Sequence, residues 1–417
     1  MTRLSVHDPA STIASMFSDA TLRYAEDLTT ALLGADALYV REQAGKLPPA
    51  ELGSTKAAMR ERFVVLNMST AHQPEPFASY IEARERFIEL RERADTLPES
   101  DRRRYYEQCC HSTIAFTRWR EGTLPFTGQI KDFLHVPPAP AGDGTVDALR
   151  EEMRDLLNAM GYTGDLAAQF AAWEERHRVP PDEVEGVLNE LMDEAWERTA
   201  ARMPLPAPKS DGMRVVTETG APYNARCDYL QRRVHLNIDP VLTRPALKHL
   251  AVHECYPGHY LQFKLRETWY REGTAPADGL LSVVNTASSC TFEGIADNGM
   301  AVLDWLDGDD DRLSALMTQY RAAIVTKAAW RLHALHWSAM ETKEWLRSQT
   351  LVGGEGWVAN RMRFIAAPHR CALIWSYWYG EQSVAPVWHR TPKERRGDFL
   401  RFLYGRMHSP QSVALFA

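Results

Sequence analysis

The spacing of apolar residues along the chain is mostly that of α-helices. Apolar positions recur every three or four residues in the stretches 77–97, 145–162, 180–203 and 311–340, which is the period of an amphipathic helix. The pattern changes in 214–220 and 229–239, where β-branched and aromatic residues alternate with polar ones. We therefore expect a mainly α fold with one small β-hairpin or sheet.

Two proline-rich stretches divide this helical pattern. The clearer one covers 135–145 and the second covers 202–212, and both have the composition of linkers. We expect a helical N-terminal part in residues 1–140 and a helical part that carries the chemistry in residues 141–417. A chain of 417 residues is long enough for one large domain, and we expect the two parts to form one continuous compact unit.

Composition and charge narrow the classes of function. The formal net charge is −7 and no long basic run is present, which argues against a nucleic-acid-binding protein. No window reaches the roughly 18 apolar residues of a membrane helix, and the N-terminus carries His7, Asp8 and Pro9 where a signal peptide needs an apolar core. Six scattered cysteines without a CxxC pair indicate reduced thiols. We expect a cytoplasmic protein without membrane attachment; no pattern indicates its oligomeric state.

The stretch LAVHECYPGHYLQF, residues 250–263, carries the most specific chemistry. Upstream of it, Thr243 is a helix-capping residue and Pro245 suits a first helical turn. We therefore expect a helix that starts after Thr243 and ends near His253 and Glu254.

The spacing of the two histidines in this stretch is unusual. In a common zinc motif, two histidines four positions apart share a helix face, and a glutamate between them activates water. Here His259 follows His253 by six positions, which in a regular helix places it about 240° around the axis. Pro257 and Gly258 disfavour a regular helix, and we expect them to form a bulge that returns His259 toward His253. The alternative is two ordinary histidines beside a helix kink.

The stretch 288–306 supplies a third candidate ligand. Glu293 stands there among small and apolar residues of a predicted helix, and a carboxylate in such surroundings is unfavourable unless it is paired or binds a metal. Two histidines and one glutamate make a three-ligand zinc site with a position open for water. The alternative is an ordinary acidic residue on a helix.

These two stretches resemble the signature segments of the bacterial domain-of-unknown-function 885 family. The matching residues are His253, Glu254, Pro257, Gly258, His259 and Gln262 in the first segment and Glu293, Gly294 and Ala296 in the second. The resemblance implies a large helical metallopeptidase-like fold, distantly similar to gluzincins and carboxypeptidase Taq-type peptidases. Tyr260 and Ile295 replace a histidine and a tryptophan of the family pattern, so the chain resembles a divergent member.

Carried over to this chain, the resemblance implies that His253, His259 and Glu293 bind zinc. Glu254 is then the general base. It takes a proton from a water molecule whose pKa the zinc lowers toward about 7, and it passes a proton to the leaving amine.

A metallohydrolase also needs a group that stabilises the oxyanion. Tyr377 is the best match to a later tyrosine of the family, and His336 is the better match to a family histidine. The alternatives are an aromatic core residue and an ordinary structural histidine. Arg370 suits a substrate carboxylate or a structural ion pair, and we expect Cys255 and Cys290 to be packing residues.

Three functional hypotheses follow. The first is a zinc-dependent, peptidase-like hydrolase that acts on a peptide or amide bond in a cleft between helical lobes, near the small β element. The second keeps the zinc but acts on a small amide or ester of a specialised pathway. The third is a catalytically silent binding scaffold. Glu254 argues against the third, because a purely structural metal site needs no general base.

Overall fold

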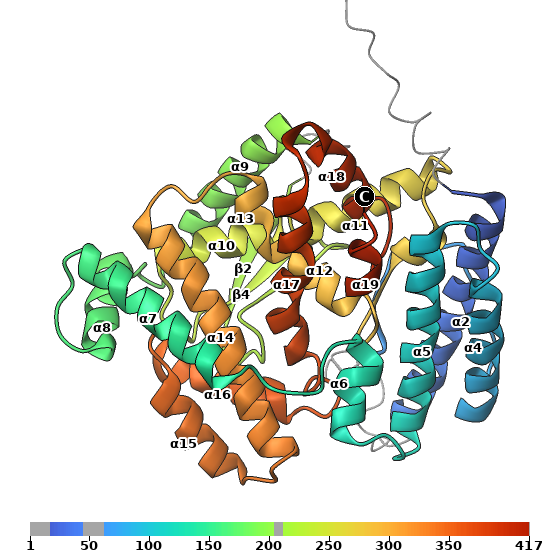
Figure 1. Ribbon diagram of the computed structural model, residues 1–417, viewed down its shortest axis with the longest axis horizontal. Coiled ribbons are helices and arrows are strands. Elements are labelled where there is room, and N and C mark those ends of the chain that lie inside the picture. The colour runs from blue at the N-terminus through green and yellow to red at the C-terminus, as the bar shows by residue number, and fades with distance from the viewer. Residues whose placement is uncertain (1–16, 45–61, 204–211, 417) are drawn as a thin grey trace, which may run out of the picture. The chain divides into compact units, whose positions relative to one another are not determined.

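The computed structural model describes residues 17–44, 62–203 and 212–416 and shows a mainly α protein with two small sheets (Figure 1). The expected fold class is thereby confirmed. The N-terminal signal-peptide expectation and most of the second linker fall outside the described residues. Among the helices that are described, none combines the length and apolar composition needed to cross a bilayer.

The chain forms two compact units, and both are assembled from separated segments. Unit 1 comprises the described residues of Met1–Pro125 together with Phe263–Ser288 and Thr391–Ala417, and unit 2 comprises Phe126–Gln262 and Ser289–Arg390. The expected division at residue 140 does not coincide with this one, because two later segments of the chain pack with the N-terminal helices.

Unit 1 is built around three helices that pack in chain order, α2 on α4 and α4 on α5. Its elements are α2 (Asp19–Ala44), β1 (Val64–Asn67), α4 (Tyr80–Ala94), α5 (Ser100–Arg120), η3 (Ala277–Leu280), β5 (Leu281–Val283), η4 (Lys393–Arg395), α18 (Arg396–Tyr404) and α19 (Pro410–Val413). Strands β1 and β5 pair antiparallel. Its core is aromatic, since Tyr24, Phe87 and Tyr106 are at most 2% exposed.

Unit 2 holds both signature stretches. Its elements are α6 (Phe126–Leu134), α7 (Asp143–Ala159), α8 (Leu166–His177), α9 (Val184–Arg202), β2 (Arg214–Glu218), β3 (Ala225–Asp228), β4 (Arg233–Asn237), α10 (Arg244–Glu254), α12 (Ser289–Asp297), α13 (Gly299–Val302), α14 (Asp309–His333), α15 (Ala339–Gln349), α16 (Gly354–Ala366) and α17 (Ile374–Arg390). Helix α11 (His259–Arg271) begins in unit 2 and continues into unit 1. The expected small sheet is confirmed: β4 lies in its centre, parallel to β2 and antiparallel to β3.

One predicted helix is two helices in the structure. The pattern over 311–340 predicts a single helix, but α14 ends at His333 and α15 starts at Ala339. Ser338 causes the new start, because its hydroxyl accepts a hydrogen bond from the Glu341 amide while the Glu341 carboxylate accepts one from the Ser338 amide. Such a capping box satisfies amide groups that a helix start leaves without partners.

Candidate metal centre

Helix α10 starts as the sequence predicts and carries the first two site residues at its end. The Thr243 hydroxyl accepts a hydrogen bond from the Ala246 amide at 3.4 Å, and Pro245 lies in the first turn. The helix ends at Glu254, and Cys255 after it has φ −117° and ψ −85°, outside the helical region. His253 and Glu254 are 8% and 5% exposed, so the last turn of α10 is buried.

The Pro257–Gly258 turn separates two helices instead of bulging within one. The Tyr256–Pro257 peptide bond is cis, and α11 starts afresh at His259. The Gly258 amide donates to the Val252 carbonyl at 2.9 Å. A Cβ on Gly258 would lie 1.8 Å from the His253 carbonyl oxygen, so only glycine fits this close approach. The expected helix end near Glu254 is confirmed, the expected bulge is a turn between two helices, and the expected return of His259 is confirmed: the two imidazole centroids lie 4.6 Å apart.

Two glycines position the helix that carries Glu293. Helix α12 packs closely against α17 (Figure 1), and a Cβ on Gly294 would lie 2.0 Å from the Gly380 carbonyl oxygen. The absence of both side chains lets the two backbones touch. Because Glu293 precedes Gly294 and Tyr377 stands one turn before Gly380, the same contact brings Tyr377 and Glu293 to one place.

Glu293 lies at the spacing of a tetrahedral site from both candidate histidine ligands. Glu293 Oε2 lies 3.3 Å from His253 Nε2 and 3.5 Å from His259 Nε2, and all three atoms lie within 4.8 Å of one another. A tetrahedral zinc ion with bonds of about 2.1 Å holds its ligand atoms about 3.4 Å apart. The structure therefore brings together the three residues that the sequence proposes as ligands.

Asp297 orients the first histidine, and the sequence interpretation missed it. His253 Nδ1 donates to Asp297 Oδ1 at 2.8 Å, which leaves Nε2 as the nitrogen that faces Glu293. Burial alone would raise the pKa of Asp297, but His253 and His249 beside it hold that pKa below its ordinary value. A carboxylate on the second nitrogen fixes the tautomer of a ligating histidine. The available signal is its spacing, four residues after Glu293 on the same helix.

A second group of potential ligands shares His253. It consists of His249, His253 and Asp297, and His249 Nε2 lies 3.5 Å from Asp297 Oδ1. The 2.8 Å between His253 Nδ1 and Asp297 Oδ1 is a hydrogen-bond distance and is shorter than the roughly 3.4 Å between two ligands of one tetrahedral zinc ion. The geometry therefore favours the group that contains Glu293.

The second histidine is held by an aromatic ring. The imidazole of His259 stacks on the phenyl ring of Phe292 with centroids 4.2 Å apart and an interplanar angle of 6°. Phe292 precedes Glu293 on α12, and its carbonyl accepts a hydrogen bond from Gln262 Nε2 at 3.1 Å. The start of α11 is thus attached to α12 at the turn that carries Glu293.

Glu254 adds a second buried carboxylate to the cluster. Its Oε2 atom is buried and has no hydrogen-bond partner among the described residues. The charge of Glu254 acts on three neighbours: after burial, it helps to raise the pKa of the Cys227 and Cys255 thiols, and it is one of the charges that act on Tyr377. Cys227 lies on β3, so the small sheet flanks the centre as expected.

Tyr377 belongs to the same cluster. Burial, followed by the negative charge of Glu293, raises the pKa of its hydroxyl above the ordinary value, while Arg361 and Arg370 oppose the shift. The hydroxyl therefore stays protonated at neutral pH and is able to donate a hydrogen bond. The structure brings this candidate oxyanion donor together with both carboxylates.

His336 is not brought to the cluster. It lies in the loop between α14 and α15, with an exposed side chain and a positive φ of 56°. The expectation of a helical His336 is wrong because α14 has already ended. The neighbouring His333 donates from Nε2 to the Ile365 carbonyl at 2.6 Å and packs against Phe126, as a structural histidine does.

Cys255, Cys290 and Tyr260 are packing residues. Cys255 and Cys290 are buried, and neither belongs to a group of potential ligands among the described residues. The ring of Tyr260, which replaces a histidine of the family pattern, packs against Tyr229 and Tyr256 with centroids 5.3 and 5.5 Å away. The unusual tyrosine therefore contributes to the core.

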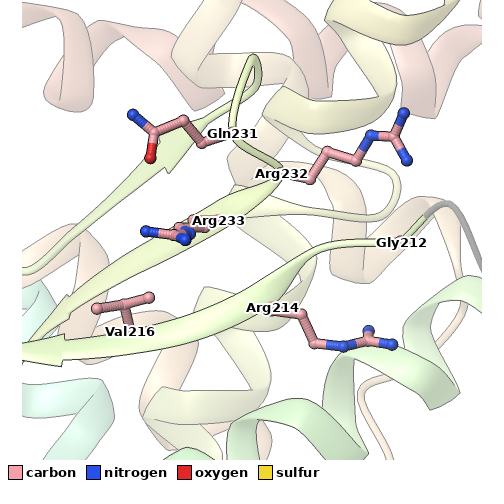
Figure 2. A pocket seen from close by; sticks show the side chains of 6 residues that line it. All are labelled: Gly212, Arg214, Val216, Gln231, Arg232 and Arg233. Atoms are coloured by element: carbon pink, nitrogen blue, oxygen red, sulfur yellow. The ribbon is translucent and has the colours of Figure 1, made fainter.

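A separate hollow lies on the small sheet. Figure 2 shows its lining residues, Gly212, Arg214, Val216, Gln231, Arg232 and Arg233. None of them is a candidate ligand, general base or oxyanion donor. The hollow and the metal centre are therefore formed by different residues.

Comparisons with known proteins bear on the fold alone. No family model and no curated protein matches the chain. A solved structure described as a "putative lipoprotein" from Colwellia psychrerythraea is similar with a TM-score of 0.52 and 15% identity, over 80% of this chain and 65% of that one. A second, from Shewanella oneidensis and of unknown function, has a TM-score of 0.48 and 14% identity, over 80% and 70%. The chain thus spans about 65% of the length of the first protein, and the likeness to it shows a shared fold.

Proposed function

We propose that the protein is a zinc-dependent hydrolase of peptide or amide bonds. The observation that carries the proposal is the spacing of three ligand atoms, 3.3 and 3.5 Å from Glu293 Oε2 to the two histidines, next to the buried carboxylate of Glu254. Two imidazoles and one carboxylate form the ligand set of a catalytic zinc site, in which the fourth position stays open.

The buried carboxylate oxygens of the site also support the binding of a cation. Glu293 Oε2 and Glu254 Oε2 are buried without a hydrogen-bond partner among the described residues. Burial of an unpaired carboxylate costs several kcal/mol. A divalent cation held by His253, His259 and Glu293 would compensate the negative charge of Glu293.

Each side chain of the site has a separate role in hydrolysis. Zinc, when bound, supplies Lewis acidity that polarises a carbonyl group and lowers the pKa of a water molecule toward about 7. Glu254 accepts the proton of the attacking water and returns a proton to the leaving nitrogen. Tyr377 donates a hydrogen bond to the oxygen on which negative charge develops. Asp297 keeps His253 in the tautomer that presents Nε2.

Metal analysis combined with a substrate screen tests the proposal. We expect one zinc ion per chain in the purified protein, loss of that ion in His259→Ala, and hydrolysis of members of a panel of peptides and small amides. Glu254→Gln should keep the zinc and lose hydrolysis by about two to four orders of magnitude, the usual contribution of a general base. Cys290→Ser, outside the ligand set, is the matched control.

Three results would contradict the proposal. They are a chain that binds no divalent metal, a His259→Ala variant with a full complement of zinc, and a Glu254→Gln variant with full turnover. Turnover of small amides or esters with no cleavage of any peptide would assign the protein to the second hypothesis. Bound zinc without any turnover would assign it to the silent scaffold.

A further inference from the structure

Two arginines gather with Tyr377 around one phenyl ring of unit 2. The guanidinium carbons of Arg361 and Arg370 lie 5.4 and 5.6 Å from the centroid of Phe364. The ring of Tyr377 meets the same phenyl ring edge-on, with centroids 6.1 Å apart. Phe364 itself is 2% exposed. The end of α16 and the turn after it thus place two positive charges beside the proposed oxyanion donor.

Neither arginine has an acidic partner in the part of the chain that the structure describes. No carboxylate of the described residues lies within ion-pair distance of Arg361 or Arg370, although many other arginines of the chain are paired. Arg361 is 9% exposed and donates from Nη2 to Asn360 Oδ1 at 2.9 Å and to Asn224 Oδ1 at 3.4 Å, while its Nε is buried without a partner. Burial of a cation without an acidic partner is unfavourable. We therefore expect an anion to bind beside these guanidinium groups.

The surrounding groups do not reduce the positive charge. Burial, with the charge of Arg370 adding to it, lowers the pKa of Arg361 to about 10, which leaves the guanidinium charged at neutral pH. Arg370 donates from Nε to His369 Nε2 at 3.2 Å. Burial, and then the charge of Arg370, lowers the pKa of His369 to about 3, so this histidine is a neutral acceptor.

We propose that Arg361 and Arg370 bind the free carboxylate of the substrate, so that the enzyme removes the C-terminal amino acid of an N-acylated chain. The proposal rests on the proposed hydrolase function and names its substrate class. The guanidinium fork matches a carboxylate in bidentate geometry. Tyr377 packs on the same Phe364 ring as both arginines, so a carboxylate bound at the arginines lies beside the proposed oxyanion donor.

The reaction is an ordinary hydrolysis. The carbon–nitrogen bond before the last residue breaks, the oxygen of one water molecule joins the acyl carbon, and the leaving nitrogen receives a proton through Glu254. The acyl group on the substrate is either a peptide or a small acyl group, since both leave the same free α-carboxylate for the arginines.

Binding of a matched pair of ligands tests the carboxylate site without turnover. Benzoylglycyl-phenylalanine and its C-terminal amide are titrated into the full chain after zinc removal, by calorimetry. We expect the acid to bind about 10- to 100-fold more tightly than the amide, the usual effect of hydrogen bonds to a charged group. Arg370→Gln should abolish this preference. Arg361→Lys, a second variant that retains the buried charge, should reduce it.

Arg363→Gln is the matched control, because Arg363 lies on the same helix but pairs with Asp239 at 3.7 Å; it should keep the preference. Equal affinity for acid and amide in the unaltered chain would overturn the proposal, as would a preference that survives in both Arg370→Gln and Arg361→Lys.

Hydrolysis by the zinc-loaded protein separates this proposal from the hydrolase itself. We expect kcat/KM for short peptides or benzoyl amino acids with a free C-terminus to exceed that for their C-terminal amides by at least about 10-fold. Equal cleavage of the amides would overturn the carboxylate site and leave the hydrolase standing. Preferential binding of the acid by a chain that neither holds zinc nor hydrolyses would support the carboxylate site and overturn the hydrolase.

Discussion

The two ring nitrogens of His253 face two different carboxylates. Nε2 lies 3.3 Å from Glu293, and Nδ1 donates to Asp297 at 2.8 Å. One nitrogen is thus available to a metal while the other is committed to a hydrogen bond. In the proposed zinc site, Asp297 positions His253 and does not contact the ion.

We predict that Asp297→Asn weakens zinc binding about 10- to 100-fold, the usual cost of removing such a partner. Competition against a chelator of known affinity measures the change. His249→Gln, which alters the other neighbour of Asp297, should leave the zinc affinity close to that of the unaltered chain. Loss of zinc in His249→Gln would instead assign the ion to the group of His249, His253 and Asp297.

Glu381 on α17 makes the stability of the fold depend on pH. Burial, and then the charge of Asp297, raises the pKa of Glu381 from its ordinary value of 4.5 to about 7, although Gln319 donates to it at 3.1 Å. Between pH 4.5 and 7 the folded chain keeps a proton that the unfolded chain releases. The free energy of unfolding therefore falls as the pH rises through this window.

We predict that Glu381→Gln removes this loss of stability. The variant should match the original chain near pH 4 and exceed it above pH 7 by up to about 3 kcal/mol. Urea unfolding at pH 4 and pH 8 measures the difference. An equal pH dependence in both proteins would show that Glu381 is ionised in the folded state.

At the scale of elements, the close approach of α12 to α17 holds the site together. A Cβ on Gly294 would lie 2.0 Å from the Gly380 carbonyl, whereas α9 contains a glycine, Gly186, with open space at the same position. The motif glycine after Glu293 therefore serves helix packing and not turn geometry.

We predict that Gly294→Ala lowers the free energy of unfolding by about 1–3 kcal/mol, the usual cost of overpacking, and weakens zinc binding because α12 moves away from α17. Gly186→Ala, in a helix without such a contact, should be neutral or slightly stabilising. Thermal unfolding and metal analysis of the two variants measure both effects. A Gly294→Ala variant as stable as Gly186→Ala would contradict this account.

In the chain as a whole, the proposed metal ligands all lie in unit 2 and are up to 40 positions apart in the sequence. An ion that binds the folded chain and not the unfolded one raises stability in proportion to the logarithm of its concentration. The ion should therefore stabilise the tertiary contact between α10, α11 and α12.

We predict that chelation of zinc lowers the Tm of the unfolding transition that contains unit 2. At a free zinc concentration about 1,000 times the Kd, the stabilisation is about 4 kcal/mol. Calorimetry with and without chelator measures the shift, and His259→Ala should show none. An unchanged Tm in the original chain would show that the ion does not bind the folded state selectively.

Features that depend on neighbours along the chain can be predicted from the sequence alone. The start of α10 follows from the hydroxyl of Thr243 and the fixed φ of Pro245, and the helical class follows from a period that each segment repeats locally. The approach of His259 to His253 is also a local feature, because only a short segment that contains Pro257 and Gly258 separates the two histidines. Glu293 was found because an acidic residue among apolar ones is unfavourable without a partner.

Which distant groups meet depends on how the helices pack in the folded chain. The contact of Asp297 with His253, the two unpaired arginines around Phe364 and the composition of the two units all depend on packing between segments far apart in the chain. His336 lies in a loop and not in a helix, because the hydrogen bonds of Ser338 and Glu341 start a new helix where the apolar period alone continues the old one. The hydrophobic pattern predicts which residues are buried, but the partner of each buried group depends on how the helices pack.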